Sequence, residues 1–389
     1  MKNRPLLMIP GPIDVEQVVI DAMARPPKSH LAPSFVEAFS RLLGSLRQVF
    51  LAPDAQPFVV AGSGTLAMEM AVANVIEPGD RAVVVETGYF SGRMADILER
   101  HGARVTRVAG PLGAVPDFAE IESALASGPK VVTVTHVDTS TGVLAPVERI
   151  AAIAREHGAL SIVDGVCSVG GESLRMGDWG VDVALTASQK ALGAPPGLAI
   201  VLASPRAMSA WRARKTKVAS YYADFGAWLP VLEAYEAKKN MYFATPPVQL
   251  VEALDASVAS ILADGVEARV QRHARIAGAF RAAWAALKLA MLPVSGEVAA
   301  HTLSAVYFPP GVDASLVARI GEEGAIVTGG LHPDAREKYF RVGHMGAIGP
   351  HETLAAIGAV ERALHATGYH PAPLGAAVSE AQAALATAG

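Results

Sequence analysis

The chain has 389 residues, of which 51% are hydrophobic and 18% charged, and its formal net charge is −4. This length exceeds that of one ordinary domain and the composition can bury a large core, so we expect two folded domains and little disorder. The near-neutral charge gives no reason to expect nucleic acid or an anionic membrane as a partner. No apolar run approaches the roughly 20 residues that a membrane span needs.

Cysteine usage gives an expectation about the compartment. Cys167 is the single cysteine, so no disulfide can form within the chain. Proteins without disulfides are typical of reducing compartments. The apolar stretch near the N-terminus is also too short for a signal peptide. We therefore expect a cytoplasmic protein.

Strands and helices alternate from about residue 57 to residue 204. Buried strands are predicted over residues 58–62, 81–86, 103–108, 130–136, 159–164, 182–188 and 197–204. Helices are predicted between most of them, for example over 64–76, 91–101 and 147–157. This alternation predicts an α/β architecture, in which helices cover both faces of a large, mostly parallel sheet.

The pattern changes after residue 205. Helices are predicted over 205–217, 248–264, 266–288 and 350–368, and shorter strands over 302–308, 325–330 and 338–346. We therefore divide the chain into an N-terminal arm (1–20), a large domain (21–270), a smaller C-terminal α+β domain (271–370) and a tail (371–389). The arm is expected to be extended, and the tail to be either mobile or a docked helix.

A glycine-rich turn, Gly-Ser-Gly-Thr at 62–65, lies between a predicted strand and a predicted helix. Backbone N–H groups and the positive end of the helix dipole meet at such a turn, which suits an anion such as phosphate. Residues 62–67 also match the dinucleotide pattern G-x-G-x-x-G/A, and Glu86 ends the next strand where an acidic residue would bind a ribose. A dinucleotide-dependent oxidoreductase, or a tight turn without a ligand, are therefore alternatives.

Asp164 ends one predicted strand and Lys190 follows another, so both lie at the carboxyl ends of strands, where parallel sheets place functional residues. Each alone has an ordinary explanation, as a helix cap or as a surface lysine. Lysine is costly to bury, however, unless its amine is covalently tied up. Pyridoxal 5′-phosphate (PLP) uses a lysine as its Schiff-base partner and a carboxylate to keep its pyridine nitrogen protonated. The dinucleotide interpretation gives neither residue a function.

Seven segments together resemble a known family. They are PGPIDV, AGSGTLAMEMAVANVIEPGD, THVDTSTGVLAP, SIVDGVCSVGG, LTASQKALGAPPGLAIV, YFATPPVQL and YFRVGHMG, in this order. They resemble segments of the class V aminotransferases, which have PLP fold type I, and the resemblance covers nearly the whole chain. It is strongest to the alanine–glyoxylate branch, with serine–glyoxylate and serine–pyruvate enzymes as near relatives.

The resemblance implies roles for particular residues. It implies that Lys190 carries the Schiff base and that Asp164 pairs with the pyridine nitrogen. The other implied cofactor contacts are Ser63, Gly64, Thr65 and Gln189 at the phosphate, Phe90 on the ring, and Thr139 at the phenolic oxygen, with Ser140 as the substitute if the register slips. Arg341 is implied to bind the substrate carboxylate, and Gly11 to line the substrate pocket. Tyr242 and Thr245 are implied to reach the partner subunit's phosphate, so a homodimer with shared active sites is expected.

The implied reaction is a two-step transamination in which L-alanine gives pyruvate and glyoxylate gives glycine, with L-serine as another donor. One arginine candidate for a carboxylate favours small donors over dicarboxylates such as aspartate. A PLP lyase or cysteine desulfurase is another class, although Cys167 lies next to the aspartate strand rather than on a late loop. No metal-ligand spacing joins the histidines, so no metal is expected.

Overall fold

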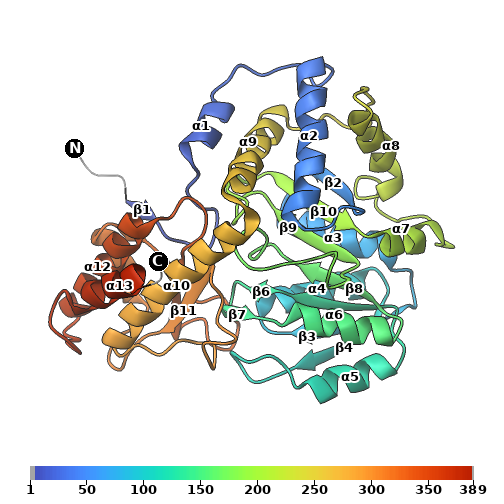
Figure 1. Ribbon diagram of the computed structural model, residues 1–389. Helices are drawn as coiled ribbons and strands as arrows, with labels where there is room; N and C mark the ends of the chain where they lie inside the picture. The colour runs from blue at the N-terminus through green and yellow to red at the C-terminus, as the bar shows by residue number, and fades with distance from the viewer. Residues whose placement is uncertain (1–4, 388–389) are drawn as a thin grey trace.

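The computed structural model describes residues 5–387 (Figure 1). The first four residues of the predicted arm and the last two of the predicted tail lie outside the described residues. A seven-stranded sheet forms the larger part, and the C-terminal elements, coloured orange to red, lie beside it in Figure 1. No helix in the described range combines the length and apolarity that crossing a bilayer requires.

The large sheet has the strand order β2-β10-β9-β8-β5-β3-β4. Its strands are β2 (Gln56–Ala61), β3 (Arg81–Glu86), β4 (Arg104–Ala109), β5 (Val131–Thr135), β8 (Leu160–Asp164), β9 (Val183–Ala187) and β10 (Leu198–Ala203). Each of the seven predicted strands is present. The residues of β5, β8, β9 and β10 are all buried, as expected for strands covered on both faces.

One strand of this sheet runs against the others. β10 pairs antiparallel with both β2 and β9, whereas β3, β4, β5, β8 and β9 pair in parallel. Only residues 188–197 connect β9 to β10. A parallel crossover needs a dozen or more residues, so this short connection makes the chain reverse. The sheet is therefore mixed.

Helices cover the sheet. α3 packs on β9 and β10, α4 on β3, β4 and β5, and α6 on β5 and β8 (Figure 1). The helices up to residue 264 are α1 (Gln17–Met23), α2 (Pro33–Val49), α3 (Gly64–Val75), α4 (Tyr89–Arg100), α5 (Phe118–Ala126), α6 (Val147–Glu156), α7 (Pro205–Arg212), α8 (Phe225–Glu236) and α9 (Val248–Asp264). Of these, the sequence analysis did not predict α1, α2, α5 or α8.

The predicted helix over 205–217 ends early, at Arg212. The chain leaves the helix because the next residues bind the turn after α3. Arg214 donates to the carbonyl oxygen of Ile76, and the N–H groups of Lys215 and Thr216 donate to the Glu77 carboxylate at 2.9 and 2.7 Å. These tertiary contacts override the local helical pattern.

The C-terminal part is α+β. Its elements are α10 (Val266–Ala286), β11 (Leu303–Tyr307), α11 (Ser315–Glu322), β12 (Ala325–Ile326), β13 (Thr328–Gly329), β14 (Tyr339–Gly343), α12 (Pro350–Ala366) and α13 (Ala376–Thr387). α13 packs on α10 and α12, so the described tail is a docked helix. Within the arm, β1 (Leu6–Leu7) pairs with β12. α10 runs unbroken across residue 270, and the proposed division into domains stays a prediction.

Candidate active site

A cavity of about 310 Å³ lies at the carboxyl ends of β2, β5, β8 and β9. Nine residues singled out from the sequence line it: Gly11, Ser63, Gly64, Thr65, Phe90, Thr139, Asp164, Gln189 and Lys190. They come from segments up to 179 positions apart, from Gly11 to Lys190. The sheet brings them together because parallel strands deliver their ends to the same edge.

Lys190 lies in the turn that joins β9 to β10, and its Nζ donates a hydrogen bond to the carbonyl oxygen of Pro10. Gly11 approaches it so closely that an added Cβ would lie 2.6 Å from Nζ. Burial lowers the pKa of the Lys190 ammonium, and the positive charge of Arg341 lowers it further. The neutral amine is the form that acts as a nucleophile or a base, so this environment favours both uses.

Asp164 ends β8 and is 3% exposed. Burial raises the pKa of its carboxyl group to about 7, although the N–H of Val166 donates to Oδ1 at 2.9 Å. Within residues 5–387, this N–H is the one hydrogen-bond donor that the carboxylate has. Because one hydrogen bond offsets little of the cost of burying a carboxylate, Asp164 favours a cationic or N–H-bearing partner in the cavity.

The first turn of α3 faces the same cavity. Ser63 is the N-cap residue, Gly64 and Thr65 begin the helix, and no side chain caps it. Its free N–H groups and the helix dipole make this turn an anion site. An added Cβ on Gly64 would lie 2.9 Å from a methyl group of Val166, so the turn packs too closely for a side chain there. Gln189 Oε1 is buried and has no hydrogen-bond partner among the described residues.

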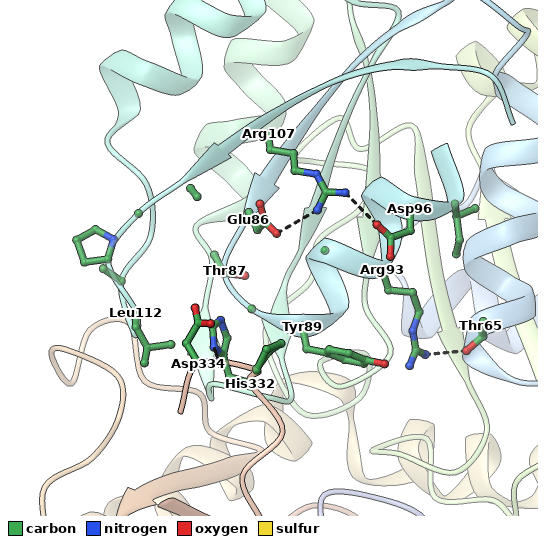
Figure 2. A pocket seen from close by; sticks show the side chains of 18 of the residues that line it. Thr65, Glu86, Thr87, Tyr89, Arg93, Asp96, Arg107, Leu112, His332 and Asp334 are labelled. Atoms are coloured by element: carbon green, nitrogen blue, oxygen red, sulfur yellow. Dashed lines mark hydrogen bonds and ion pairs between the residues drawn. The ribbon is translucent and has the colours of Figure 1, made fainter. Parts of the chain in front are cut away.

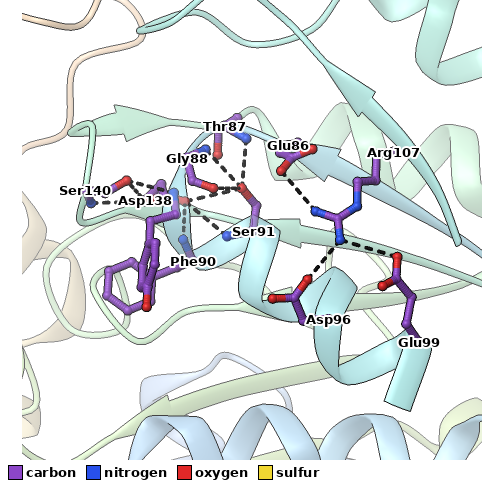
Figure 3. A network of polar contacts seen from close by, with 11 residues as sticks. Glu86, Thr87, Gly88, Phe90, Ser91, Asp96, Glu99, Arg107, Asp138 and Ser140 are labelled. Atoms are coloured by element: carbon purple, nitrogen blue, oxygen red, sulfur yellow. Dashed lines mark hydrogen bonds and ion pairs between the residues drawn. The ribbon is translucent and has the colours of Figure 1, made fainter. Parts of the chain in front are cut away.

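Asp138, in the strand β6 (Val137–Asp138), is fully buried and ties this strand to the start of α4 (Figure 3). Its Oδ2 accepts hydrogen bonds from the N–H groups of Phe90 and Ser91, each at 3.1 Å, and from the Ser91 hydroxyl at 3.3 Å. Its Oδ1 accepts from the N–H and the hydroxyl of Ser140 at 3.0 and 2.6 Å. Because the N-cap of α4 is Gly88, Asp138 replaces the missing cap and holds Phe90 in the cavity wall.

Arg341 reaches toward the cavity from β14 but is not among the residues that line it. Its Nε donates to the carbonyl oxygen of Gly329 at 2.9 Å, and its Nη1 donates to that of Thr139 at 3.1 Å. The residue is 8% exposed, and burial lowers its pKa. Two of its five N–H donors are thus held by carbonyl groups, and the other three have no hydrogen-bond partner among residues 5–387, which leaves them for a carboxylate.

Tyr242 and Thr245 lie apart from this cavity. Their hydroxyl oxygens are 3.3 Å from each other, and Tyr242 is 61% exposed. Its ring lies 5.6 Å from that of His30, between ring centroids. Neither residue lines the 310 Å³ cavity of its own chain, and the role assigned to them in a partner's site stays a prediction.

A second cavity, of about 660 Å³, adjoins the first (Figure 2). Thr65 and Arg93 line both cavities. Glu86 lines only the second, where its carboxylate lies 3.5 Å from the Arg107 guanidinium. The carboxylate that the dinucleotide interpretation assigned to a ribose is therefore engaged in an ion pair outside the candidate site.

Comparison with known proteins identifies the family. The family model described as aminotransferase class V matches residues 20–343. The chain belongs to the class V aminotransferases. It is 40% identical to alanine–glyoxylate aminotransferase 1 of Saccharomyces cerevisiae, over 91% of this chain and 95% of that one. It is 35% identical to the L-aspartate–glyoxylate aminotransferase of Paracoccus denitrificans, over 98% and 96%.

A solved structure of the same family supports the fold. The alanine–glyoxylate aminotransferase of Nostoc sp. superposes with a TM-score of 0.87 at 33% identity, over 94% of this chain and 96% of that one. The predicted PLP fold type I architecture is thereby confirmed, with the mixed sheet described above. Family membership also favours the phosphate interpretation of residues 62–67 over the dinucleotide one.

The cofactor of class V aminotransferases is PLP, and the residues of the cavity fit it. Lys190 presents a buried amine for a Schiff base. Asp164 is a buried carboxylate that forms no ion pair among residues 5–387, although the charges of Lys190 and Arg93 act on it at longer range. The uncapped first turn of α3 suits a phosphate. The partnerless Gln189 Oε1 is one more buried polar atom at this site. The contact assigned to each of these residues stays a prediction.

Two residues of the site were missed by the sequence analysis. Arg93 lines the cavity, and its position three residues after Phe90 on one helix was the available signal. Asp138 directly precedes the predicted Thr139, but nothing in the sequence shows that it receives hydrogen bonds from a helix 48 residues away. The place of Arg93 in the cavity wall and the hydrogen bonds to Asp138 both depend on how α4 packs beside the turn after β6.

Proposed function

We propose that this class V aminotransferase transfers the amino group of L-alanine to glyoxylate, giving pyruvate and glycine, with L-serine as a further donor. The observation that carries the proposal is that Lys190 and Asp164 line one 310 Å³ cavity beside an uncapped helix start. The similarity to alanine–glyoxylate aminotransferases supports the choice of substrates. A cytoplasmic location is proposed from the single cysteine.

Lys190, Asp164 and the 63–65 turn would hold PLP, which when bound supplies an electron sink for the electrons released as the Cα–H bond breaks. Lys190 Nζ accepts the Cα proton and later returns it, and the lowered pKa of this amine keeps a larger fraction of it neutral. Asp164 Oδ holds a proton on the pyridine nitrogen by its negative charge. Val137 and Val166 give the cavity an apolar wall beside these groups.

The Arg341 guanidinium would bind the α-carboxylate of the substrate, since three of its N–H donors remain free of protein carbonyl groups. Alanine needs no second cation. A second candidate donor is L-aspartate, because Arg93 lines the same cavity and could face a distal carboxylate. Similarity to an L-aspartate–glyoxylate aminotransferase also favours this candidate.

The experiment is to follow the visible absorption of the PLP-loaded protein while L-alanine, L-serine or L-aspartate is added, followed by glyoxylate. We expect bleaching by alanine, recovery with glyoxylate, and production of pyruvate and glycine. Lys190→Ala should show neither change. If L-aspartate bleached the absorption fastest, aspartate and not alanine would be the preferred donor. A wild-type protein that never becomes coloured with PLP would contradict the proposal.

We infer further that two copies form a dimer with shared sites. Tyr242 and Thr245 do not line their own cavity, and several large apolar side chains are exposed in the same region of the sequence, including Tyr221 at 84% and Met241 at 47%. Exposed aromatic groups of this kind mark interaction surfaces.

Mixing two inactive variants tests the shared site. In a hybrid of Lys190→Ala with the double variant Tyr242→Ala/Thr245→Ala, one site combines an intact Lys190 with an intact Tyr242 and Thr245. We expect the mixture to regain activity after subunit exchange. Absence of complementation, together with an active monomer in sedimentation, would contradict shared sites.

A further inference from the structure

Arg93 joins the two cavities at the end of the candidate site that holds the 63–65 turn. Its Nη1 donates a hydrogen bond to Thr65 Oγ1 at 2.8 Å (Figure 2). Its guanidinium carbon lies 4.9 Å from the centre of the Phe90 ring and 5.2 Å from that of Tyr89. Two aromatic rings and one hydroxyl group thus hold the guanidinium beside the start of α3.

The charge of Arg93 acts at longer range on the Asp164 carboxylate, whose pKa it lowers, but Arg93 forms no ion pair among residues 5–387. Within residues 5–387, no carboxylate forms an ion pair with it, whereas Arg107 on the far side of the same cavity pairs with Glu86, Asp96 and Glu99. An unpaired guanidinium next to free helix N–H groups creates a strongly positive end of the cavity.

The hydrogen bond to Thr65 also orients its hydroxyl group. Because Oγ1 accepts from Arg93, its own proton is free to be donated elsewhere, and Thr65 lines the cavity. A hydroxyl that accepts from a cation is polarised and becomes a better donor. Arg93 therefore strengthens the anion site both by its charge and through Thr65.

We propose that Arg93 is a cofactor-anchoring residue, which supplies the positive charge for the phosphate of PLP at the 63–65 turn. This inference rests on the proposed function, because it requires PLP in this cavity. Arg93 would recognise an anion in either of two ligands. One is the phosphate of PLP, and the other is the distal carboxylate of a dicarboxylate amino donor. The bond to Thr65, at the first turn of α3, favours the phosphate.

The test compares PLP with pyridoxal, which has the same ring and aldehyde but no phosphate. Dissociation constants of both are measured on the cofactor-depleted protein by visible absorption and tryptophan fluorescence, for wild type, Arg93→Gln and Arg93→Lys. The matched control is Arg100→Gln, which removes the same charge from the same helix at the second cavity.

We expect Arg93→Gln to weaken PLP binding by about tenfold or more, the factor expected for one charge-assisted hydrogen bond, and to leave pyridoxal binding unchanged. Arg93→Lys should lie between, and added salt should shrink the difference from wild type. Arg100→Gln should bind PLP as wild type does.

Three results would overturn the inference. If Arg93→Gln weakened the binding of PLP and pyridoxal equally, Arg93 would act on the cofactor's ring or on the fold and not on the phosphate. Unchanged PLP binding with a raised KM for L-aspartate alone would assign Arg93 to the donor's second carboxylate. A wild-type protein that binds neither PLP nor pyridoxal would contradict the proposed function as well. The first two results contradict only the role of Arg93.

Discussion

Asp138, in β6, and Asp164, at the end of β8, are two buried carboxylates at the same edge of the large sheet, and they differ in how many hydrogen bonds the protein gives them. Asp138 accepts five hydrogen bonds from Phe90, Ser91 and Ser140. Among the described residues, the Asp164 carboxylate accepts one hydrogen bond, from the N–H of Val166. A buried carboxylate that is fully bonded holds the structure together, whereas one left short of donors is prepared for a ligand. Matched substitutions at the two aspartates test this distinction.

The largest expected effect is on activity. Asp164→Asn should lower kcat by about a hundredfold or more, because an amide cannot hold the pyridine nitrogen protonated by negative charge. The measurement is steady-state transamination of alanine and glyoxylate, with the PLP content of the variant determined by absorption. A loaded variant with wild-type kcat would show that Asp164 is not the cofactor's partner.

The second effect is on stability. Asp138→Asn turns an NH2 group toward N–H donors and leaves at least one buried donor unpaired, so we expect a loss of about 3 kcal/mol in the free energy of unfolding. The same change at Asp164 should leave the stability of the cofactor-free protein equal or higher, since it removes a poorly solvated charge. Urea unfolding of both variants measures these free energies of unfolding. Equal losses of stability in the two variants would contradict the distinction between Asp138 and Asp164.

The third effect is a pH dependence. The pKa of Asp164 is about 7 in the folded chain, and about 3.9 is typical of an unfolded aspartate. Between these values the folded state keeps a proton that the unfolded state releases, so this group reduces stability as the pH rises from about 4 to 7, by a few kcal/mol at most. The stability of Asp164→Asn relative to wild type should therefore grow through this window and level off above it. A difference that does not change with pH would contradict the raised pKa.

The smallest effect concerns one donor to Asp138. Ser140→Ala removes the hydroxyl that donates to Oδ1 at 2.6 Å and accepts from the N–H of Tyr89 at 2.9 Å. Four donors to the carboxylate remain, so we expect a loss of about 1 kcal/mol in unfolding free energy. A loss as large as that of Asp138→Asn would mean that the network fails as a unit when one member is removed.

Much of the fold was predictable because its signals are local. Continuous apolar runs bounded by turns located all seven strands of the large sheet, and helix-favouring stretches bounded by turn residues located α3, α4, α6, α9, α10 and α12. The helices α1, α2, α5, α8 and α11 were missed. The early end of α7 was missed for a different reason, since it depends on contacts of residues 214–216 with a distant turn.

The candidate site also has features with local sequence signals and features that depend on long-range contacts. The sequence alone determined that Lys190, Asp164 and the 62–65 turn follow strands, and parallel strands necessarily bring such residues to one edge. The direction of β10, the five hydrogen bonds to Asp138 and the position of Arg93 against Thr65 became known from the folded structure. Each of these depends on segments far apart in the chain whose distance and orientation are set by packing, and no local pattern of residues encodes such a distance.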